Sequence, residues 1–258
     1  MNKKQLTVGV YDFTSCAGCQ MELINLEKEW LDLTRLIDFT HFRLIGRTAE
    51  DAVFDVALVE GAISTPDEAK RVKEIREKAE FVVSFGTCGS FGGVPSIKDF
   101  FKKDDIEREV YGNSSHLDSI KAEPVSAYIK VDYVMRGCPI DKTELVRVFK
   151  DLLAGKTPRE PQGTVCRECK EKGNRCLFKE RPCMGAITNA GCGALCPSNG
   201  WPCLACRGPT DDSNIESALE LLKEHKVPKD QIQQMFRFFA GRAKQFEDRR
   251  SKMCQDLI

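Results

Sequence analysis

The sequence predicts an α/β protein with a doubly wound parallel sheet, followed by a small irregular cysteine-rich module and C-terminal helices. The sheet is predicted because strand-like and helix-like segments alternate over the first part of the chain, which is typical of parallel strands covered by helices. The module is predicted because residues 166–206 hold eight of the 13 cysteines and few aliphatic residues. We therefore expect three parts, at residues 1–155, 156–210 and 211–258.

Hydrophobic periodicity defines the individual elements. Residues 6–11 alternate apolar and polar side chains, as a half-buried strand does, and residues 20–30 carry apolar side chains close to helical spacing. Residues 65–80 begin with a threonine, a proline and acidic residues, which is a strong helix start. Further strands are expected at residues 39–45, 53–59, 81–85 and 129–135, and a helix at residues 141–153.

Composition excludes several classes of partner. The chain has 39 basic and 39 acidic residues, so its net charge gives no reason to expect nucleic acid or an anionic membrane as a partner. No apolar run approaches the ~18 residues of a membrane span. The opening "MNKKQLTVGVYD" enters a strand pattern without the long apolar core of a signal peptide. We expect a soluble, cytoplasmic protein.

The cysteines indicate metal binding. A reducing cytosol disfavours a disulfide framework. Cys254 stands apart near the C-terminus, which leaves twelve cysteines, or three sets of four. Four thiolates are the usual ligands of one structural zinc ion or one [4Fe–4S] cluster. The candidate ligands are Cys16, Cys19, Cys88, Cys138, Cys166, Cys169, Cys176, Cys183, Cys192, Cys196, Cys203 and Cys206.

Four of these cysteines follow predicted strands. Cys16 and Cys19 come after the first strand, and Cys88 and Cys138 come after two later ones. Because the carboxyl ends of parallel strands meet at one edge of a sheet, we expect the four thiols to lie close together. A redox dithiol at "SCAGC", or a flavin phosphate bound by this loop, are alternatives. Neither explains the cysteines of "GTCG" and "RGCP".

The other eight cysteines divide into two sets. Gaps of two residues allow both sulfurs to reach one metal centre, and a cysteine followed by proline, as at Cys196, is common in iron–sulfur sequences. A zinc ribbon would use two Cys-x-x-Cys pairs and leave four cysteines without a role. We therefore favour iron–sulfur clusters over a zinc-stabilised binding module, and we expect the segment to need metal in order to fold.

The motifs resemble those of a known family. "SCAGCQMEL", "GTCGSFGGVP" and "RGCPI" are similar to the three proximal-cluster motifs of [NiFe]-hydrogenase small subunits, and "CMGAITNAGCGALCPSNGWPCLACRGP" is similar to their C-terminal cluster module. The resemblance implies a flavodoxin-like first domain and three [4Fe–4S] clusters that relay electrons. It also implies a separate large subunit that carries the NiFe centre, an electron-accepting flavin or iron–sulfur subunit, and no hydrogenase activity for this chain alone.

The resemblance assigns each cysteine to a cluster. The proximal ligands are Cys16, Cys19, Cys88 and Cys138, the medial ligands are Cys192, Cys196, Cys203 and Cys206, and the distal ligands are Cys166, Cys169, Cys176 and Cys183. Exported family members have a histidine in place of Cys166 and a proline near the position of Cys196. The added thiolates lower cluster potentials. Lower cluster potentials suit a cytoplasmic enzyme that is coupled to NAD(P), the deazaflavin F420 or a heterodisulfide reductase.

Some residues fall outside these motifs. Glu22 faces the large subunit in the family, and it is equally explained as a carboxylate near a helix start. We expect His41, His116 and His225 to have surface or capping roles, and Cys254 to be a lone thiol. The homologous quinone-oxidoreductase subunit shares the first domain, but that family has adjacent cysteines in its first motif and lacks the eight-cysteine module.

Overall fold

The structure is a computed structural model that describes residues 5–49, 51–112 and 117–248. The chain divides into two compact units, Met1–Glu160 and Pro161–Ile258. The second unit takes in both the cysteine-rich segment and the helices after it, so the three-part division stays a prediction. No helix within the described ranges is long and apolar enough to cross a membrane.

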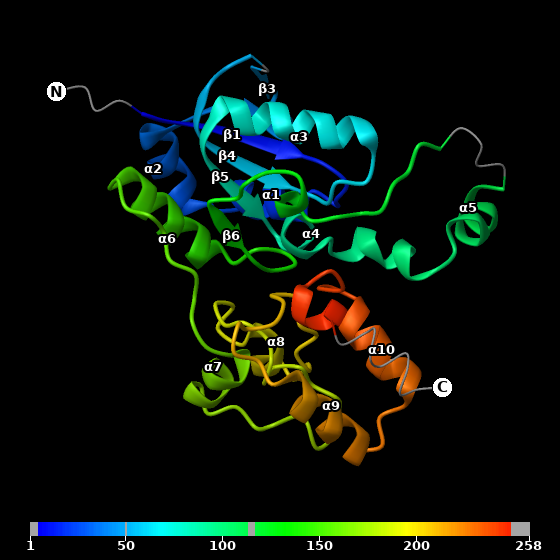
Figure 1. Ribbon diagram of the computed structural model, residues 1–258. Coiled ribbons are helices and arrows are strands. Elements are labelled where there is room, and N and C mark those ends of the chain that lie inside the picture. The colour runs from blue at the N-terminus through cyan, green and yellow to red at the C-terminus, as the bar shows by residue number, and fades with distance from the viewer. Residues whose placement is uncertain (1–4, 50, 113–116, 249–258) are drawn as a thin grey trace. The chain divides into compact units, whose positions relative to one another are not determined.

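A six-stranded sheet forms the centre of the first unit, in the order β3-β2-β1-β4-β5-β6 (Figure 1). The strands are β1 (Leu6–Asp12), β2 (Ile37–Phe42), β3 (Arg47–Thr48), β4 (Phe54–Glu60), β5 (Ala79–Phe85) and β6 (Tyr133–Met135). Neighbours pair in parallel except β2 and β3, which are antiparallel. Without the short β3, the strand order is that of a flavodoxin-like sheet. The predicted α/β class is confirmed.

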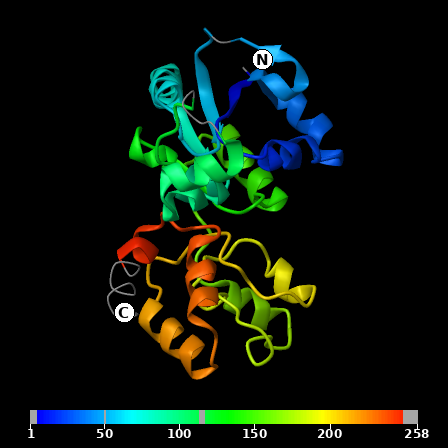
Figure 2. The same cartoon turned by 90° about the vertical axis from the view of Figure 1, so that its right-hand side faces the viewer.

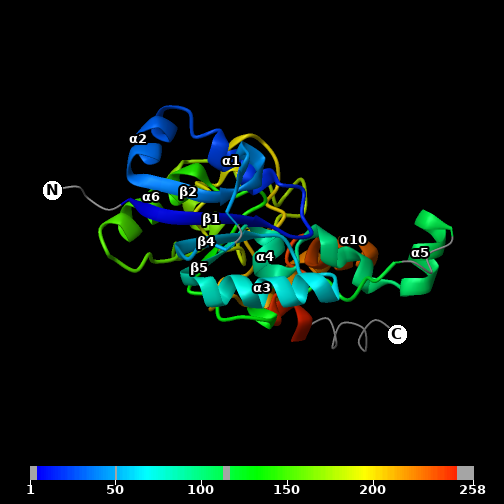
Figure 3. The same ribbon diagram turned by 90° about the horizontal axis from the view of Figure 1, so that it is seen from above.

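Helices cover both faces of this sheet (Figure 3). On one face lie α1 (Gly18–Ile24), α2 (Lys28–Leu36) and α6 (Lys142–Leu153), and their apolar residues share a buried core with β1, β2 and β5. On the other face lies α3 (Pro66–Lys78), which packs through Val72 and Ile75 against β4 and β5. The two cores explain why β4 is mostly apolar, because a parallel strand in the middle of a sheet is buried on both faces.

Two local predictions differ from the structure. The single helix expected at residues 20–30 is two helices, because α1 ends at Ile24 and Glu27 adopts a positive φ of 50° before α2. The strand expected at residues 39–45 is β2, which begins at Ile37, and the chain turns into the 3₁₀ helix η1 (Arg43–Ile45). The start of α3 was predicted correctly, and Thr65 and Glu68 cap each other there.

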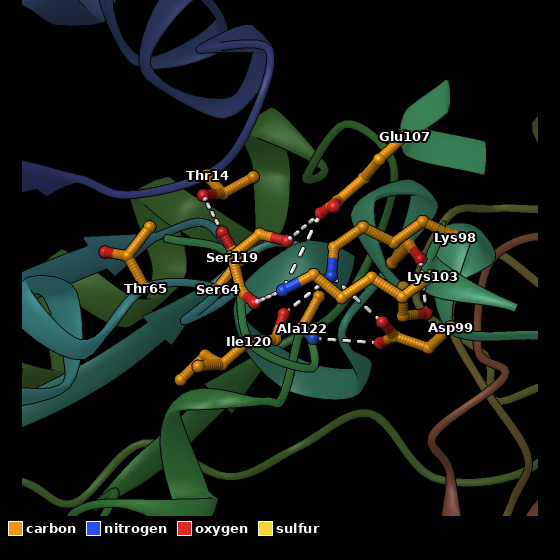
Figure 4. A network of polar contacts seen from close by, with 12 residues as sticks. Thr14, Ser64, Thr65, Lys98, Asp99, Lys103, Glu107, Ser119, Ile120 and Ala122 are labelled. Atoms are coloured by element: carbon orange, nitrogen blue, oxygen red, sulfur yellow. Dashed lines mark hydrogen bonds and ion pairs between the residues drawn. The ribbon is translucent and has the colours of Figure 1, made fainter. Parts of the chain in front are cut away.

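The segment between β5 and β6 leaves the sheet (Figure 1). It contains α4 (Thr87–Phe91), α5 (Lys103–Tyr111) and the 3₁₀ helices η2 (Val94–Phe100) and η3 (Val125–Ala127). Figure 4 shows how its two arms are joined: Lys98 Nζ donates to the carbonyl of Ile120 at 2.6 Å, and Asp99 accepts from the backbone N–H of Ala122 at 2.8 Å.

The second unit contains four helices among its described residues (Figure 2). They are α7 (Val165–Glu171), α8 (Leu195–Ser198), α9 (Ile215–Glu224) and α10 (Lys229–Arg237). Irregular chain carries most of the cysteines between α7 and α9. The buried cluster in this part consists of Val165, Cys169, Ala194 and Cys203, with Cys183 and Cys192 packed against it. Cysteines therefore take the place that large aliphatic residues have in an ordinary core.

An ion pair that ties α3 to the start of β6 gives a pH-dependent prediction. Asp132 pairs with Arg76 and accepts the backbone N–H of Val82 at 2.8 Å. Burial alone would raise the pKa of Asp132, but the N–H of Val82 and the Arg76 guanidinium hold that pKa below its ordinary value. A carboxyl whose folded-state pKa is lowered stabilises the protein above its unfolded-state pKa, and this stabilisation disappears as the pH falls through the folded-state pKa.

We expect Asp132→Asn to lower the free energy of unfolding by about 1–3 kcal/mol at neutral pH, and by less as the pH falls below about 4. Urea unfolding of the variant and the parent chain, compared over this pH range, measures the difference. A difference that does not change with pH would show that the carboxylate charge contributes nothing.

Candidate functional site

The structure places the first four candidate cysteines at the carboxyl edge of the sheet. Cys16 and Cys19 follow β1, and Cys19 lies in the first turn of α1. Cys88 lies in α4, directly after β5, and Cys138 follows β6. The three loops therefore bring together residues that are more than a hundred positions apart in sequence.

The electrostatics of these thiols reflect their proximity. Burial is the largest cause of the raised pKa of Cys19, and the charges of Glu60 and of two other thiols, Cys88 and Cys138, raise it further. Burial likewise raises the pKa of Cys88 to about 12, and Cys138 and Cys16 add to the effect. Thiolates so close together would repel one another, so a positively charged guest such as a metal cluster would stabilise them.

Two glycines make room for the sulfur atoms. A Cβ atom added to Gly86, which has a φ of +87°, would lie 2.3 Å from the Sγ of Cys19. A Cβ atom added to Gly93, with a φ of +54°, would lie 2.7 Å from the Sγ of Cys88. Only glycine combines such backbone angles with so close an approach.

Glu60 is a residue of this site that the sequence did not reveal. It ends β4, its side chain is 2% exposed, and it accepts the backbone N–H of Cys19 at 3.1 Å and the side-chain amide of Gln20 at 2.9 Å. Burial raises the pKa of Glu60, and the hydrogen bonds from Gln20 and Cys19 oppose that shift. One feature of the sequence could have identified Glu60: it is a carboxylate at the end of the apolar run "VALVE".

The second set of four thiols lies around α7. Cys166 and Cys169 are on the helix, whose start is capped by Thr164 Oγ1 accepting from the backbone N–H of Arg167 at 3.3 Å. The other three members are Cys169, Cys176 and Cys183. The pKa of Cys166 is raised to about 11, mainly by burial and in addition by the charges of these three thiols.

The third set is brought together in part. Cys203 is buried, and this burial is the largest cause of its raised pKa. Hydrogen bonds oppose the shift, and the charges of Cys206 and Cys183 add to it. The backbone N–H of Cys203 donates to the Sγ of Cys183 at 3.2 Å, so the second and third sets are neighbours. Cys192 packs against the same buried cluster as Cys203. Cys196 is exposed on α8, and its membership of this set stays a prediction.

The chemistry of these donor sets suits iron–sulfur clusters. In the described residues, no three side chains of His, Cys, Asp or Glu converge closely enough to hold one metal ion. A [4Fe–4S] cluster instead takes four thiolates that surround a volume, because each thiolate binds a separate iron atom. The described cysteines are all free thiols. The residues present fit the group, and their role as ligands stays a prediction.

The remaining predicted residues have varied outcomes. His225 is exposed at the end of α9, with its Nδ1 2.9 Å from the carbonyl oxygen of Leu221, as expected of a capping residue. The prediction for His41 was wrong, because its ring is fully buried and stacks on Tyr11 with the centroids 4.5 Å apart. His116 and Cys254 lie outside the described residues.

Glu22 has a partner on its own chain. Its carboxylate lies 3.4 Å from the Nζ of Lys142, which also donates to the carbonyl of Asn25 at 3.0 Å. The pair joins α1 to the start of α6. Glu22 lies beyond the first turn of α1, so the interpretation as a carboxylate at the helix start is wrong.

Comparison with known proteins establishes the family. The model of the NADH ubiquinone oxidoreductase 20 Kd subunit family matches residues 16–152, more than half of the chain. The chain belongs to this family. Relatives that match 80% or more of this chain are named as hydrogenase subunits. The chain is 35% identical to sulfhydrogenase 2 subunit delta of Pyrococcus furiosus, over 91% of this chain and 99% of the relative. It is 33% identical to a subunit of the F420-non-reducing hydrogenase vhu of Methanocaldococcus jannaschii, over 80% of this chain and 83% of the relative.

These relatives confirm the resemblance predicted from the motifs, and they identify the chain as a subunit of a hydrogenase, an oxidoreductase that acts on H2. Solved structures support the fold. An NAD⁺-reducing [NiFe]-hydrogenase matches with a TM-score of 0.57 at 22% identity, over 61% of this chain and 96% of that one. The NiFeSe hydrogenase of Desulfomicrobium baculatum matches with a TM-score of 0.52 at 18% identity, over 81% and 96%.

Proposed function

We propose that this member of the family is the electron-relay subunit of a [NiFe]-hydrogenase. It carries electrons between a NiFe centre in the large subunit and an acceptor subunit through three [4Fe–4S] clusters. The observation that carries this proposal is the grouping of free thiols: four at the carboxyl edge of the sheet and up to eight in the second unit. A relay needs several redox groups within one chain.

The proposed ligands follow the sequence motifs. The proximal cluster is held by Cys16, Cys19, Cys88 and Cys138, the medial cluster by Cys192, Cys196, Cys203 and Cys206, and the distal cluster by Cys166, Cys169, Cys176 and Cys183. The clusters supply one-electron redox chemistry. The chain supplies thiols with raised pKa values, which lose their protons when iron binds, and glycines that leave space beside the sulfur atoms.

The proposed setting is the cytoplasm, where the acceptor is a flavin or iron–sulfur subunit. Two observations support it. The described cysteines are free thiols, and the relatives include a hydrogenase named for its acceptor, the NAD-reducing hydrogenase of Cupriavidus necator. Thiolate-only ligand sets give low cluster potentials, which match acceptors such as NAD(P) or F420.

Metal analysis of the purified complex tests the cofactors. We expect about twelve iron atoms and about twelve acid-labile sulfides for this chain, as three cubane clusters require. About three zinc ions without sulfide would instead identify a zinc-stabilised module and overturn the proposal.

A ligand substitution tests the relay. In the complex, Cys88→Ser should abolish reduction of the acceptor by H2 while H/D exchange at the NiFe centre continues, because exchange needs no electron relay. Cys254→Ser is the matched control, and it should leave both activities unchanged. Unimpaired acceptor reduction in a Cys88→Ser complex would contradict the proposed role.

A further inference from the structure

We propose that Arg207 and Glu168 are an opposed pair of charges beside Cys192 that set the reduction potential of the medial cluster in opposite directions. The inference rests on the proposed function, because it takes Cys192 as a cluster ligand. It concerns two residues that are adjacent to predicted ligands in sequence: Glu168 between Cys166 and Cys169, and Arg207 directly after Cys206.

Arg207 is a buried cation against the backbone that precedes Cys192. Its side chain is 1% exposed, and its Nε donates to the carbonyl oxygen of Ala190 at 2.6 Å. Its guanidinium packs directly on Gly191, where an added Cβ atom would lie 2.5 Å from a guanidinium nitrogen. Arginine stays protonated in proteins, and burying its charge is costly unless negative charge lies nearby. Four thiolates around a cluster provide negative charge.

Glu168 holds the same loop from α7. Its carboxylate accepts the backbone N–H of Gly191 at 2.7 Å and that of Ala194 at 3.2 Å. One carboxylate oxygen lies 3.9 Å from the Sγ of Cys192. The Cys192 loop is therefore bound to a carboxylate and a guanidinium at once, and both charged groups come from segments that carry other predicted ligands.

The two charges act on Cys192 with opposite sign. The Glu168 carboxylate lies 3.9 Å from the Sγ of Cys192, and the Arg207 guanidinium packs on Gly191, which directly precedes Cys192. A nearby cation stabilises the reduced cluster and a nearby anion destabilises it, and both effects are strong where water is excluded. Arg207 should therefore raise the medial potential, whereas Glu168 should lower it.

Redox titration of the holo-complex, followed by EPR, tests this inference. The medial signal is the one that changes in a Cys192→Ser complex. Arg207→Gln should shift the reduction equilibrium of that signal about tenfold toward the oxidised form, which is about 59 mV for one electron. Glu168→Gln should shift it about tenfold toward the reduced form, while the amide oxygen still accepts a backbone N–H.

The matched control is Arg175→Gln, which removes an arginine of the same unit whose side chain is 80% exposed. Water and salt screen such a charge, so its shift should be several-fold smaller. Arg207→Lys keeps the charge and should keep the parent potential. If Arg207→Gln does not fold, the shift expected of Glu168→Gln tests the inference. Shifts of the same sign in the two main variants, or shifts no larger than the control, would overturn the inference. Absence of iron and sulfide from the parent complex would instead overturn the proposed function.

Discussion

Replacing Gly86 with alanine is expected to remove about four of the roughly twelve iron atoms from this chain, that is, the whole proximal cluster. The added Cβ atom would lie 2.3 Å from the Sγ of Cys19, far inside normal contact. The backbone of Cys19 cannot move easily to make room, because the residue is buried and its N–H is bound to Glu60 at 3.1 Å. The Sγ atom alone must therefore move, and it leaves the position from which it binds iron.

Gly46 provides a control for the positive φ, because its φ of +77° is close to the +87° of Gly86 but nothing lies within 4 Å of an added Cβ atom. The ψ angles of the two residues differ, at 18° for Gly46 and 172° for Gly86. Gly46→Ala should cost about 1–2 kcal/mol of backbone strain and leave the iron content unchanged. Iron and sulfide analysis of both complexes separates an effect on the proximal site from the general effect of a side chain at a positive φ. Equal iron content in the two variants would show that Gly86 does not shape the site.

Local sequence patterns were sufficient for those elements whose signal is local. The strands β1 and β4 and the capped start of α3 lie within a residue or two of their predicted positions. The predicted strand at residues 129–135 shows the limit of such patterns, since only Tyr133–Met135 pairs with β5. Just before β6, the chain is held by a hydrogen bond from the backbone N–H of Val82 to the carboxylate of Asp132, two residues that are 50 positions apart. Periodicity contains no information about such a contact.

The site shows the same division. The number and spacing of the cysteines in the sequence are enough to predict them as ligands. Their position at one edge of the sheet can be predicted as well, because the carboxyl ends of parallel strands lie at the same edge. Glu60, Glu168 and Arg207 are single charged residues in a chain that is rich in charge. What makes them part of the site is burial and a bond to a distant loop, so only the folded structure distinguishes them from surface residues.

Removing iron from the complex with a chelator under reducing conditions is expected to unfold the cysteine-rich segment while the sheet survives. Amide hydrogen exchange within residues 165–206 should accelerate at least about a hundredfold, because the segment depends on bound metal for much of its folding free energy. Exchange in β1, β4 and β5 should change little outside the loops that carry the proximal ligands. Addition of iron and sulfide should restore protection.

The reason is the composition of the two cores. The sheet buries large side chains such as Leu58, Phe85 and Phe149 completely, and this burial does not depend on a cofactor. The cysteine-rich segment buries only a few large apolar side chains, such as Val165, Met184 and Ile187, alongside thiols, which supply little apolar area. Without metal, these thiols are small, weakly polar groups that cannot offset the entropy of ordering the irregular loops around them. Unchanged protection in the metal-free segment would show that packing alone holds it, and that the clusters serve electron transfer without serving the fold.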